Sequence, residues 1–234
     1  MNQSHKQQGF TLVELMLAMG FVSALLLAIA MTVIQIGNIY NTGITYQSVN
    51  QAGGALASQL QRDINSNPPF DLPGTNPVHR VTKSFGGRLC IGTYSYIWNY
   101  GKALYVNNPS QLNTYSGAES NIPINFVKVL DSTASYCANP TSLITSGDSV
   151  ELLDVGQSNL AIHSFSIMPA AYDPITNQRM YNISFLIGTN DQTALTVISG
   201  STACLTASDV NSDPTYCAIN RFDIVARAGK KVAN

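Results

Sequence analysis

Apolar residues fall into three successive patterns along the chain, and each pattern predicts a different element. Residues 15–34 are almost wholly apolar, and a helix of that length covers about 30 Å, the hydrocarbon thickness of a bilayer. Apolar and small residues then recur at helical spacing from residue 46 to residue 64. After residue 87 the period becomes two, which is typical of strands. The order predicts one long helix followed by strands.

The second pattern is a single stripe of an amphipathic helix, made by Val49, Gly53, Leu56, Leu60 and Ile64. The run Asn-Ser-Asn-Pro-Pro at residues 65–69 ends it. We expect a helix over residues 10–64, roughly 80 Å long, with a transmembrane part at 10–36 and an amphipathic continuation at 37–65. The stripe could be a coiled-coil seam, but Gly53-Gly54 and the few turns favour packing on the protein's own sheet.

The remaining residues, 66–234, are expected to form a β-rich domain after an irregular, proline-marked link at 65–87. The segments 160–168 and 180–187 flank a strong turn signal and predict a hairpin. One long helix followed by strands, with no βαβ alternation, predicts an α+β fold in which the helix packs on an antiparallel sheet. The predicted strands are residues 88–98, 102–106, 122–130, 150–155, 160–168, 180–187, 194–198 and 222–227.

Charge narrows the classes of function. Only 11% of residues are charged and the net charge is −1, so there is no basic surface that would make nucleic acid an expected partner. No charged residue lies between Glu14 and Arg62. The leader is short and carries Lys6, which places the N-terminus in the cytoplasm. An uncleaved signal anchor would explain the apolar run, but a carboxylate at Glu14 is costly in lipid and remains unexplained by that interpretation.

The residues around Glu14 carry a resemblance to a known family. They resemble the processing motif of type IV pilins and type II secretion pseudopilins, with a short basic leader, glycine, phenylalanine and Thr-Leu-Val-Glu before an apolar helix. The motif is Gly9-Phe10-Thr11-Leu12-Val13-Glu14-Leu15-Met16. The resemblance implies a pilin fold, and cleavage by a prepilin peptidase between Gly9 and Phe10. It also implies N-methylation of Phe10, so that residues 1–9 are a removed leader.

The same resemblance implies the partners. The Glu14 carboxylate would pair with the N-terminal amine of a neighbouring subunit, since two costly charges in lipid compensate one another. The expected partners are other major and minor pilins in a helical filament, the inner-membrane assembly platform, and the lipid bilayer before assembly. The protein is expected in the cytoplasmic membrane as a single-pass protein, then in an extracellular or periplasmic filament.

Two later segments, residues 56–64 and 220–229, loosely resemble minor pilins of the PilW type and J-type pseudopilins. Such subunits belong to a complex that initiates assembly and ends at the filament tip. The resemblance therefore implies a minor pilin of a type IV pilus. The sequence leaves two alternatives open, a pseudopilin of a type II secretion system and a filament-borne receptor for a surface or DNA.

All four cysteines lie in the part expected outside the cytoplasm, where disulfides form. Three pairings are possible, and we favour Cys90–Cys137 with Cys204–Cys217. The second bond would close a short polar loop that has no apolar residues to hold itself. Four buried free thiols are the alternative.

An alternating aromatic run, Tyr94, Tyr96, Trp98 and Tyr100, places four rings on one face of a strand. Such a face could stack nucleic acid bases. Aromatic residues are also favourable strand residues, and packing within the protein is the preferred interpretation.

A weak calcium pattern is formed by Asp209, Asn211 and Asp213, which have the 1-3-5 oxygen spacing of a calcium loop. Pro214 replaces the required glycine, and Asn220 stands where the glutamate belongs, so a solvated loop is favoured. His79 and His163 have no clustered partners, and no nucleophile elbow, P-loop or His-Glu-x-x-His motif occurs. We expect no enzyme activity and no cofactor.

Overall fold

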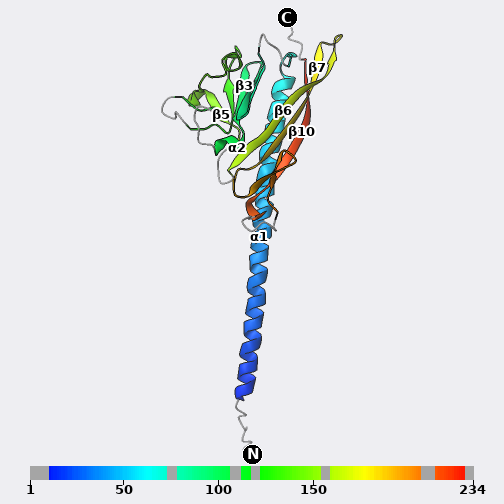
Figure 1. The fold of residues 1–234 in the computed structure, drawn as a ribbon. Coiled ribbons are helices and arrows are strands. Elements are labelled where there is room, and N and C mark those ends of the chain that lie inside the picture. The colour runs from blue at the N-terminus through cyan, green and yellow to red at the C-terminus, as the bar shows by residue number, and fades with distance from the viewer. Residues whose placement is uncertain are drawn as a thin grey trace, which may run out of the picture. The chain divides into compact units, whose positions relative to one another are not determined.

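The computed structural model describes residues 11–72, 78–105, 112–116, 122–153, 159–206 and 214–229. The chain divides into two compact units, Met1–Asn41 and Thr42–Asn234. Helix α1, Leu12–Asn65, has 54 residues, and its residues 42–65 belong to the second unit. The fold is α+β, as the sequence predicts, with α1 packed on antiparallel sheets (Figure 1).

The last turns of α1 bury the stripe that the sequence identifies. Val49, Leu60 and Ile64 are fully buried, and Gly53 and Leu56 lie between them on the same face. The predicted packing of this stripe on the protein's own sheets is therefore confirmed, and the coiled-coil alternative is wrong for this chain.

Polar side chains end α1 where the sequence predicts. Ser66 Oγ and Asn67 Nδ2 both donate to the main-chain oxygen of Asp63, at 3.0 and 2.6 Å. These bonds satisfy a carbonyl that the last helical turn leaves open. Pro68 and Pro69, which cannot continue a helix, follow directly.

The first sheet has five antiparallel strands in the order β1-β2-β3-β4-β5. The order follows the chain, so each strand pairs with its neighbour in sequence. Their bounds are β1 Arg80–Lys83, β2 Gly86–Ile91, β3 Tyr94–Asn99, β4 Phe126–Leu130 and β5 Ser149–Glu151. Short helices interrupt the connections: α2 Gly101–Leu104, α3 Ser135–Ala138 and η3 Ser146–Asp148.

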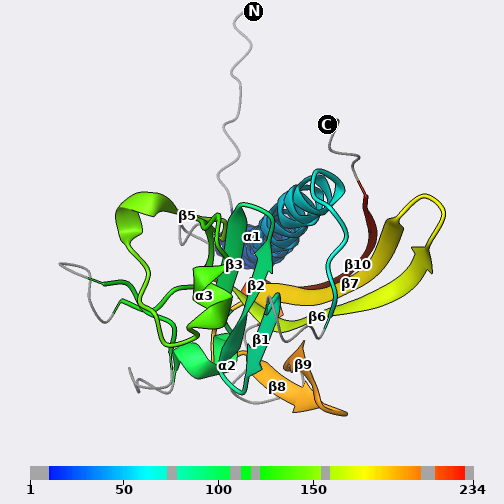
Figure 2. The same ribbon diagram turned by 90° about the horizontal axis from the view of Figure 1, so that it is seen from above.

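The second sheet has three antiparallel strands in the order β10-β7-β6, so the last strand of the chain pairs with β7, the second strand of the β6–β7 hairpin. The bounds are β6 Leu160–Asp173, β7 Gln178–Thr189 and β10 Ile219–Ala228. A separate hairpin, β8 Leu195–Ile198 and β9 Ser201–Cys204, precedes the short helix η4 Pro214–Tyr216. Figure 2 shows β2 and β3 on one flank of the end of α1 and the curved β10-β7-β6 sheet on another.

One hydrophobic core joins α1 to both sheets. Trp98 of β3 contacts Phe126 of β4 and Phe165 of β6, with ring centroids 5.7 and 4.5 Å apart. Phe185 of β7 stacks on Phe222 of β10. Tyr96 and Trp98 are 0% and 1% exposed, so the aromatic run of β3 packs inside the protein, which confirms the preferred interpretation.

Side chains of α1 cover the outer edge of β10. Gln61 Nε2 donates to the Val225 oxygen (3.0 Å), and the Arg227 amide donates to Asn65 Oδ1 (3.0 Å). Asn220 Nδ2 donates to Asn50 Oδ1 (2.7 Å). An unpaired strand edge is a template for unwanted pairing, and these contacts from the helix block it.

The other face of the five-stranded sheet carries a smaller core, which includes Ile97, Val127 and Ile144. A buried guanidinium, that of Arg88, holds the loop above it. It donates to Asn113 Oδ1 and to the main-chain oxygens of Tyr136, Asn139 and Ser142. Burial lowers the pKa of Arg88 to about 10, because none of these acceptors is charged.

The structure corrects the local predictions at three places. The predicted strand at 88–98 is two strands, because the chain turns at Gly92, whose φ is 58°. A strand was predicted at 102–106, but residues 102–104 belong to α2, in which the Ala103 amide donates to the Tyr100 oxygen (2.8 Å). Strand β1 lies inside the predicted link at 65–87.

The contact of α1 with β10 yields a matched pair of substitutions. A methyl group on Gly53 would lie 2.1 Å from Phe222 Cε2, whereas one on Gly54 meets nothing within 4 Å. We expect Gly53→Ala to lower the free energy of unfolding by about 1–3 kcal/mol through overpacking. Gly54→Ala should raise it by about 0.5–1 kcal/mol, because alanine favours the helix. Urea unfolding of both variants measures this, and equal effects would contradict the packing described.

Candidate functional site

The first unit presents an apolar helix with no covering side chains. Every residue from Thr11 to Tyr40 is exposed, including Leu12, which is 75% exposed, and Phe21, which is 68% exposed. Soluble monomers rarely expose a contiguous apolar surface of more than a few hundred Å². In the part of the chain that the structure describes, α1 is the one helix long and apolar enough to cross a membrane, by length and composition.

Two hydroxyl groups within this apolar stretch donate hydrogen bonds to the main chain of the helix itself. Ser23 Oγ donates to the Met19 oxygen and Thr32 Oγ1 to the Ala28 oxygen, each at 2.8 Å. Bonds to the preceding turn remove the cost of bringing a free hydroxyl into hydrocarbon. Neither side chain therefore brings an unsatisfied hydroxyl group into a lipid or protein environment around the helix.

The carboxylate of Glu14 is held at the start of α1 by Thr11. The Thr11 amide and Thr11 Oγ1 donate to Glu14 Oε2, at 2.9 and 2.8 Å, and the Glu14 amide donates to Thr11 Oγ1 at 3.3 Å. This is a capping box, in which residues at the N-cap and at the third helical position satisfy one another's main-chain groups. The negative charge also lies at the positive end of the helix dipole.

The capping box gives Glu14 a role that the sequence analysis did not consider. The signal was available, because Thr-x-x-Glu before an apolar run is the pattern of a capping box. Among the other predicted site residues, Gly9 and Phe10 lie outside the described residues. The weak calcium candidates Asp209, Asn211 and Asp213 also lie outside them.

All four cysteines form the two disulfides that the sequence analysis favours, Cys90–Cys137 and Cys204–Cys217. The first joins β2 to α3, and the second joins the end of β9 to the segment before β10. Disulfides persist in oxidising compartments, so both bonds suggest an extracytoplasmic location for the second unit.

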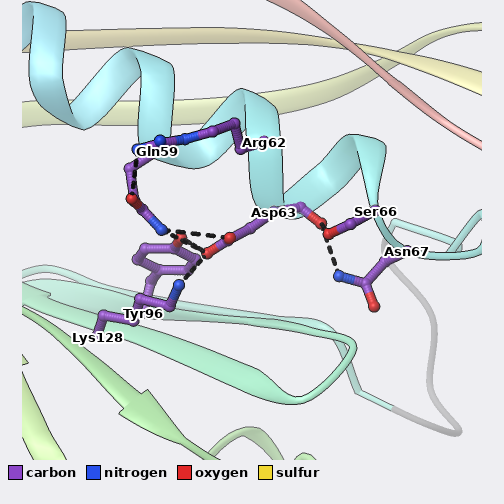
Figure 3. A network of polar contacts seen from close by, with 7 residues as sticks. All are labelled: Gln59, Arg62, Asp63, Ser66, Asn67, Tyr96 and Lys128. Atoms are coloured by element: carbon purple, nitrogen blue, oxygen red, sulfur yellow. Dashed lines mark hydrogen bonds and ion pairs between the residues drawn. The ribbon is translucent and has the colours of Figure 1, made fainter.

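A buried polar network fixes the second part of α1 to the five-stranded sheet (Figure 3). The Asp63 carboxylate accepts a hydrogen bond from the Tyr96 hydroxyl and lies 2.5 Å from Lys128 Nζ. Gln59 Nε2 lies 3.3 Å from both carboxylate oxygens. Tyr96 and Lys128 are paired residues on β3 and β4, so their side chains reach the helix from the same face of the sheet.

The electrostatics of this network favour a charged pair. Burial, and then the hydrogen bond to and the charge of Asp63, raise the pKa of Tyr96 far above its ordinary value, so the phenol stays a donor. Lys128 Nζ also lies 3.7 Å from the centre of the Tyr94 ring, a favourable cation–π geometry. The Asp63 carboxylate thus receives one cation and two neutral donors.

This network was not predicted from the sequence, although two residues indicate it. Asp63 adjoins the buried stripe of α1 and is 9% exposed, and Lys128 interrupts the apolar strand Phe-Val-Lys-Val-Leu. A charge at a core position of a helix and another in an apolar strand point to a buried pair. Which two charges meet depends on how the helix lies across the sheet, and periodicity does not determine that.

Comparisons with protein-family models, with curated proteins and with solved structures found no match to this chain. The architecture itself is consistent with a pilin-like fold, because a long, apolar N-terminal helix packs by its last turns on antiparallel sheets.

Removing the charge from the network should destabilise the second unit. We expect Asp63→Ala to lower the free energy of unfolding by about 2–4 kcal/mol, because it removes the acceptor of the buried Tyr96 hydroxyl and the counter-charge of the partly buried Lys128. Arg62→Ala removes an exposed neighbour that bonds only Gln59 among the described contacts, and should change it by less than about 0.5 kcal/mol. Urea unfolding of the full chain in detergent compares them, and equal losses would show that the network does not anchor α1.

Proposed function

We propose that this protein is a minor pilin-like subunit, cleaved by a prepilin peptidase, that helps to initiate or cap a type IV pilus. One observation carries the proposal. The exposed apolar part of α1 starts at a capped carboxylate, Glu14, directly after the Gly9-Phe10 junction expected from the sequence. A helix of this kind needs lipid or other helices around it, and a filament core provides such helices after the membrane.

The capping box explains how Glu14 could serve assembly. Two hydrogen bonds, from the amide and the hydroxyl of Thr11, and the positive end of the helix dipole stabilise the carboxylate before a partner arrives. Cleavage after Gly9 would create an amine at Phe10, one helical turn from Glu14. A neighbouring subunit displaced along the axis could then place its amine on this carboxylate, and the pair would cost less in an apolar environment than either charge alone.

A minor role is supported by the two segments that resemble larger minor pilins and pseudopilins, residues 56–64 and 220–229. Both lie where α1 and β10 pack together, so they belong to one structural feature of the second unit. We propose that the subunit has no catalytic activity of its own and acts through assembly.

The first experiment tests processing. Co-expression with an active prepilin peptidase should give a product that begins at Phe10, read by intact-mass analysis. Gly9→Val should keep residues 1–9, because a branched side chain prevents the close approach of a protease to the backbone. Gln7→Ala, in the same leader, should be cleaved normally. Retention of the leader by the unaltered chain would refute the proposal.

The second experiment separates the charge of Glu14 from its capping role. Glutamine also serves in a capping box, so Glu14→Gln keeps the cap and removes the charge. Thr11→Ala removes the cap partner and keeps the charge. If the charge acts in assembly, Glu14→Gln should reduce recovery in sheared filaments at least tenfold, normalised to the membrane pool. Thr11→Ala should stay within about twofold of the unaltered chain.

The opposite pattern would assign Glu14 to helix capping alone. Equal recovery of all three proteins would reject a part for Glu14 in the filament. Immunoblots of the sheared and membrane fractions from the same cells provide the measurement.

A further inference from the structure

A small cavity lies where the β8–β9 hairpin meets α2 and β6 in the second unit, an arrangement that can be followed in Figure 2. Its volume is about 170 Å³. Pockets for drug-sized ligands measure roughly 300–1,000 Å³, so this cavity suits a smaller molecule. Thr196 and Val197 of β8 and Thr202 of β9 line it together with Tyr105 and His163.

The Tyr105 hydroxyl is buried and has no hydrogen-bond partner among the described residues. Native proteins satisfy the large majority of buried polar groups, so a buried phenol with no partner among the described residues is a candidate to bond a ligand in the cavity. Burial, and then the nearby charge of Asp191, raise the pKa of Tyr105 to about 12. The hydroxyl therefore stays protonated at neutral pH and offers a donor.

His163 is the second partly buried ring that lines the cavity. It lies at a register shift of β6 between Ile162 and Ser164, and such irregularities redirect a side chain. Its Nε2 lies 3.1 Å from the Thr189 oxygen, so Nε2 carries the proton and donates to that oxygen. Burial lowers the pKa of His163, so the ring is neutral at pH 7.

The charges around the cavity nearly cancel. Of the described residues that line it, Lys102 carries the one full charge and is exposed. Asp191 acts on Tyr105 from nearby, and its Oδ1 accepts from the amide and hydroxyl of Thr193, at 2.9 and 2.8 Å. A strongly charged ligand would gain little here, whereas a neutral ligand would meet donors and acceptors on one side.

The wall chemistry specifies the ligand further. A phenol, the Gln192 amide and two threonine hydroxyls can exchange hydrogen bonds with several hydroxyl groups at once. Leu195 and Val197 supply an apolar surface for C–H groups. A ring that carries hydroxyls on its rim and C–H groups on its face has both properties.

We propose that the cavity between Tyr105, His163 and the β8–β9 hairpin binds a single neutral sugar ring. The proposal does not rest on filament assembly, because every group involved belongs to the second unit. The Cys204–Cys217 disulfide fastens the end of β9 and thereby holds one wall of the cavity in place.

The test is saturation-transfer NMR on the full chain in a phosphocholine-headgroup detergent, which contains no sugar. The probes are the methyl glycosides of glucose, galactose, mannose and N-acetylglucosamine. At least one should show saturable binding in the millimolar range. Tyr105→Phe should weaken that binding about three- to tenfold, because one hydrogen bond to the ligand is lost. It should not lower the unfolding temperature, since the hydroxyl has no partner among the described residues.

The matched control is Tyr172→Phe, because the Tyr172 hydroxyl bonds Asn177 at the tip of the β6–β7 hairpin. This variant should bind as the unaltered chain does. Absence of saturable binding for all four glycosides would overturn the proposal, and so would equal affinity in the Tyr105→Phe variant. Stronger binding of sodium acetate than of any glycoside would assign the cavity to anions at Lys102 instead.

Discussion

The packing of one helical stripe against two sheets is the constraint on which the second unit depends. The five-stranded and three-stranded sheets each need a hydrophobic layer on their inner face, and α1 supplies it for both. Val49, Leu56, Leu60 and Ile64 lie in the same core as Trp98 of the first sheet and Phe185 of the second. Gly53 lets Phe222 approach the helix axis. The packing of β10, an outer strand of the three-stranded sheet, therefore also depends on this stripe. The two sheets also contact one another through Trp98 and Phe165, and α1 completes the core that they share.

Polar groups determine the position of the helix within that apolar contact. Hydrophobic packing alone would allow α1 to slide or rotate on the sheets, because the hydrophobic effect is non-directional. The Asp63 carboxylate meets Lys128 and Tyr96 at one place only, and Gln61 and Asn65 reach specific main-chain groups of β10. A buried charge pair is weak evidence for stability, but displacement of either partner leaves a charge uncompensated. The same logic applies at the other end of α1, where Thr11 satisfies Glu14 locally.

Much of this fold could be predicted from the sequence because its periodicities are strong and local. The stripe from Val49 to Ile64 and the proline-marked end of α1 are properties of a short window, and both predictions are confirmed. The Gly92 turn depends on the backbone conformation of a single glycine, and the start of α2 depends on one main-chain hydrogen bond from Ala103 to Tyr100. The period-two pattern of the sequence did not predict either of them. The Asp63–Lys128 pair and the Tyr105 cavity join residues distant in sequence, so no local pattern could identify them. The capping box at Thr11 and Glu14 was readable but was overlooked.

The contact of α1 with β10 also bears on the order in which the protein folds. Asn50, Gln61 and Asn65 bond to residues of β10 that lie 162 to 170 positions further along the chain. The helix emerges first during synthesis and its partner strand emerges almost last. The stripe of α1 therefore lacks part of its packing partner until nearly the whole chain has been translated. Contacts of such long sequence separation slow folding and prolong the exposure of apolar surface. A protein built this way gains from any factor that shields this stripe of α1 during that interval.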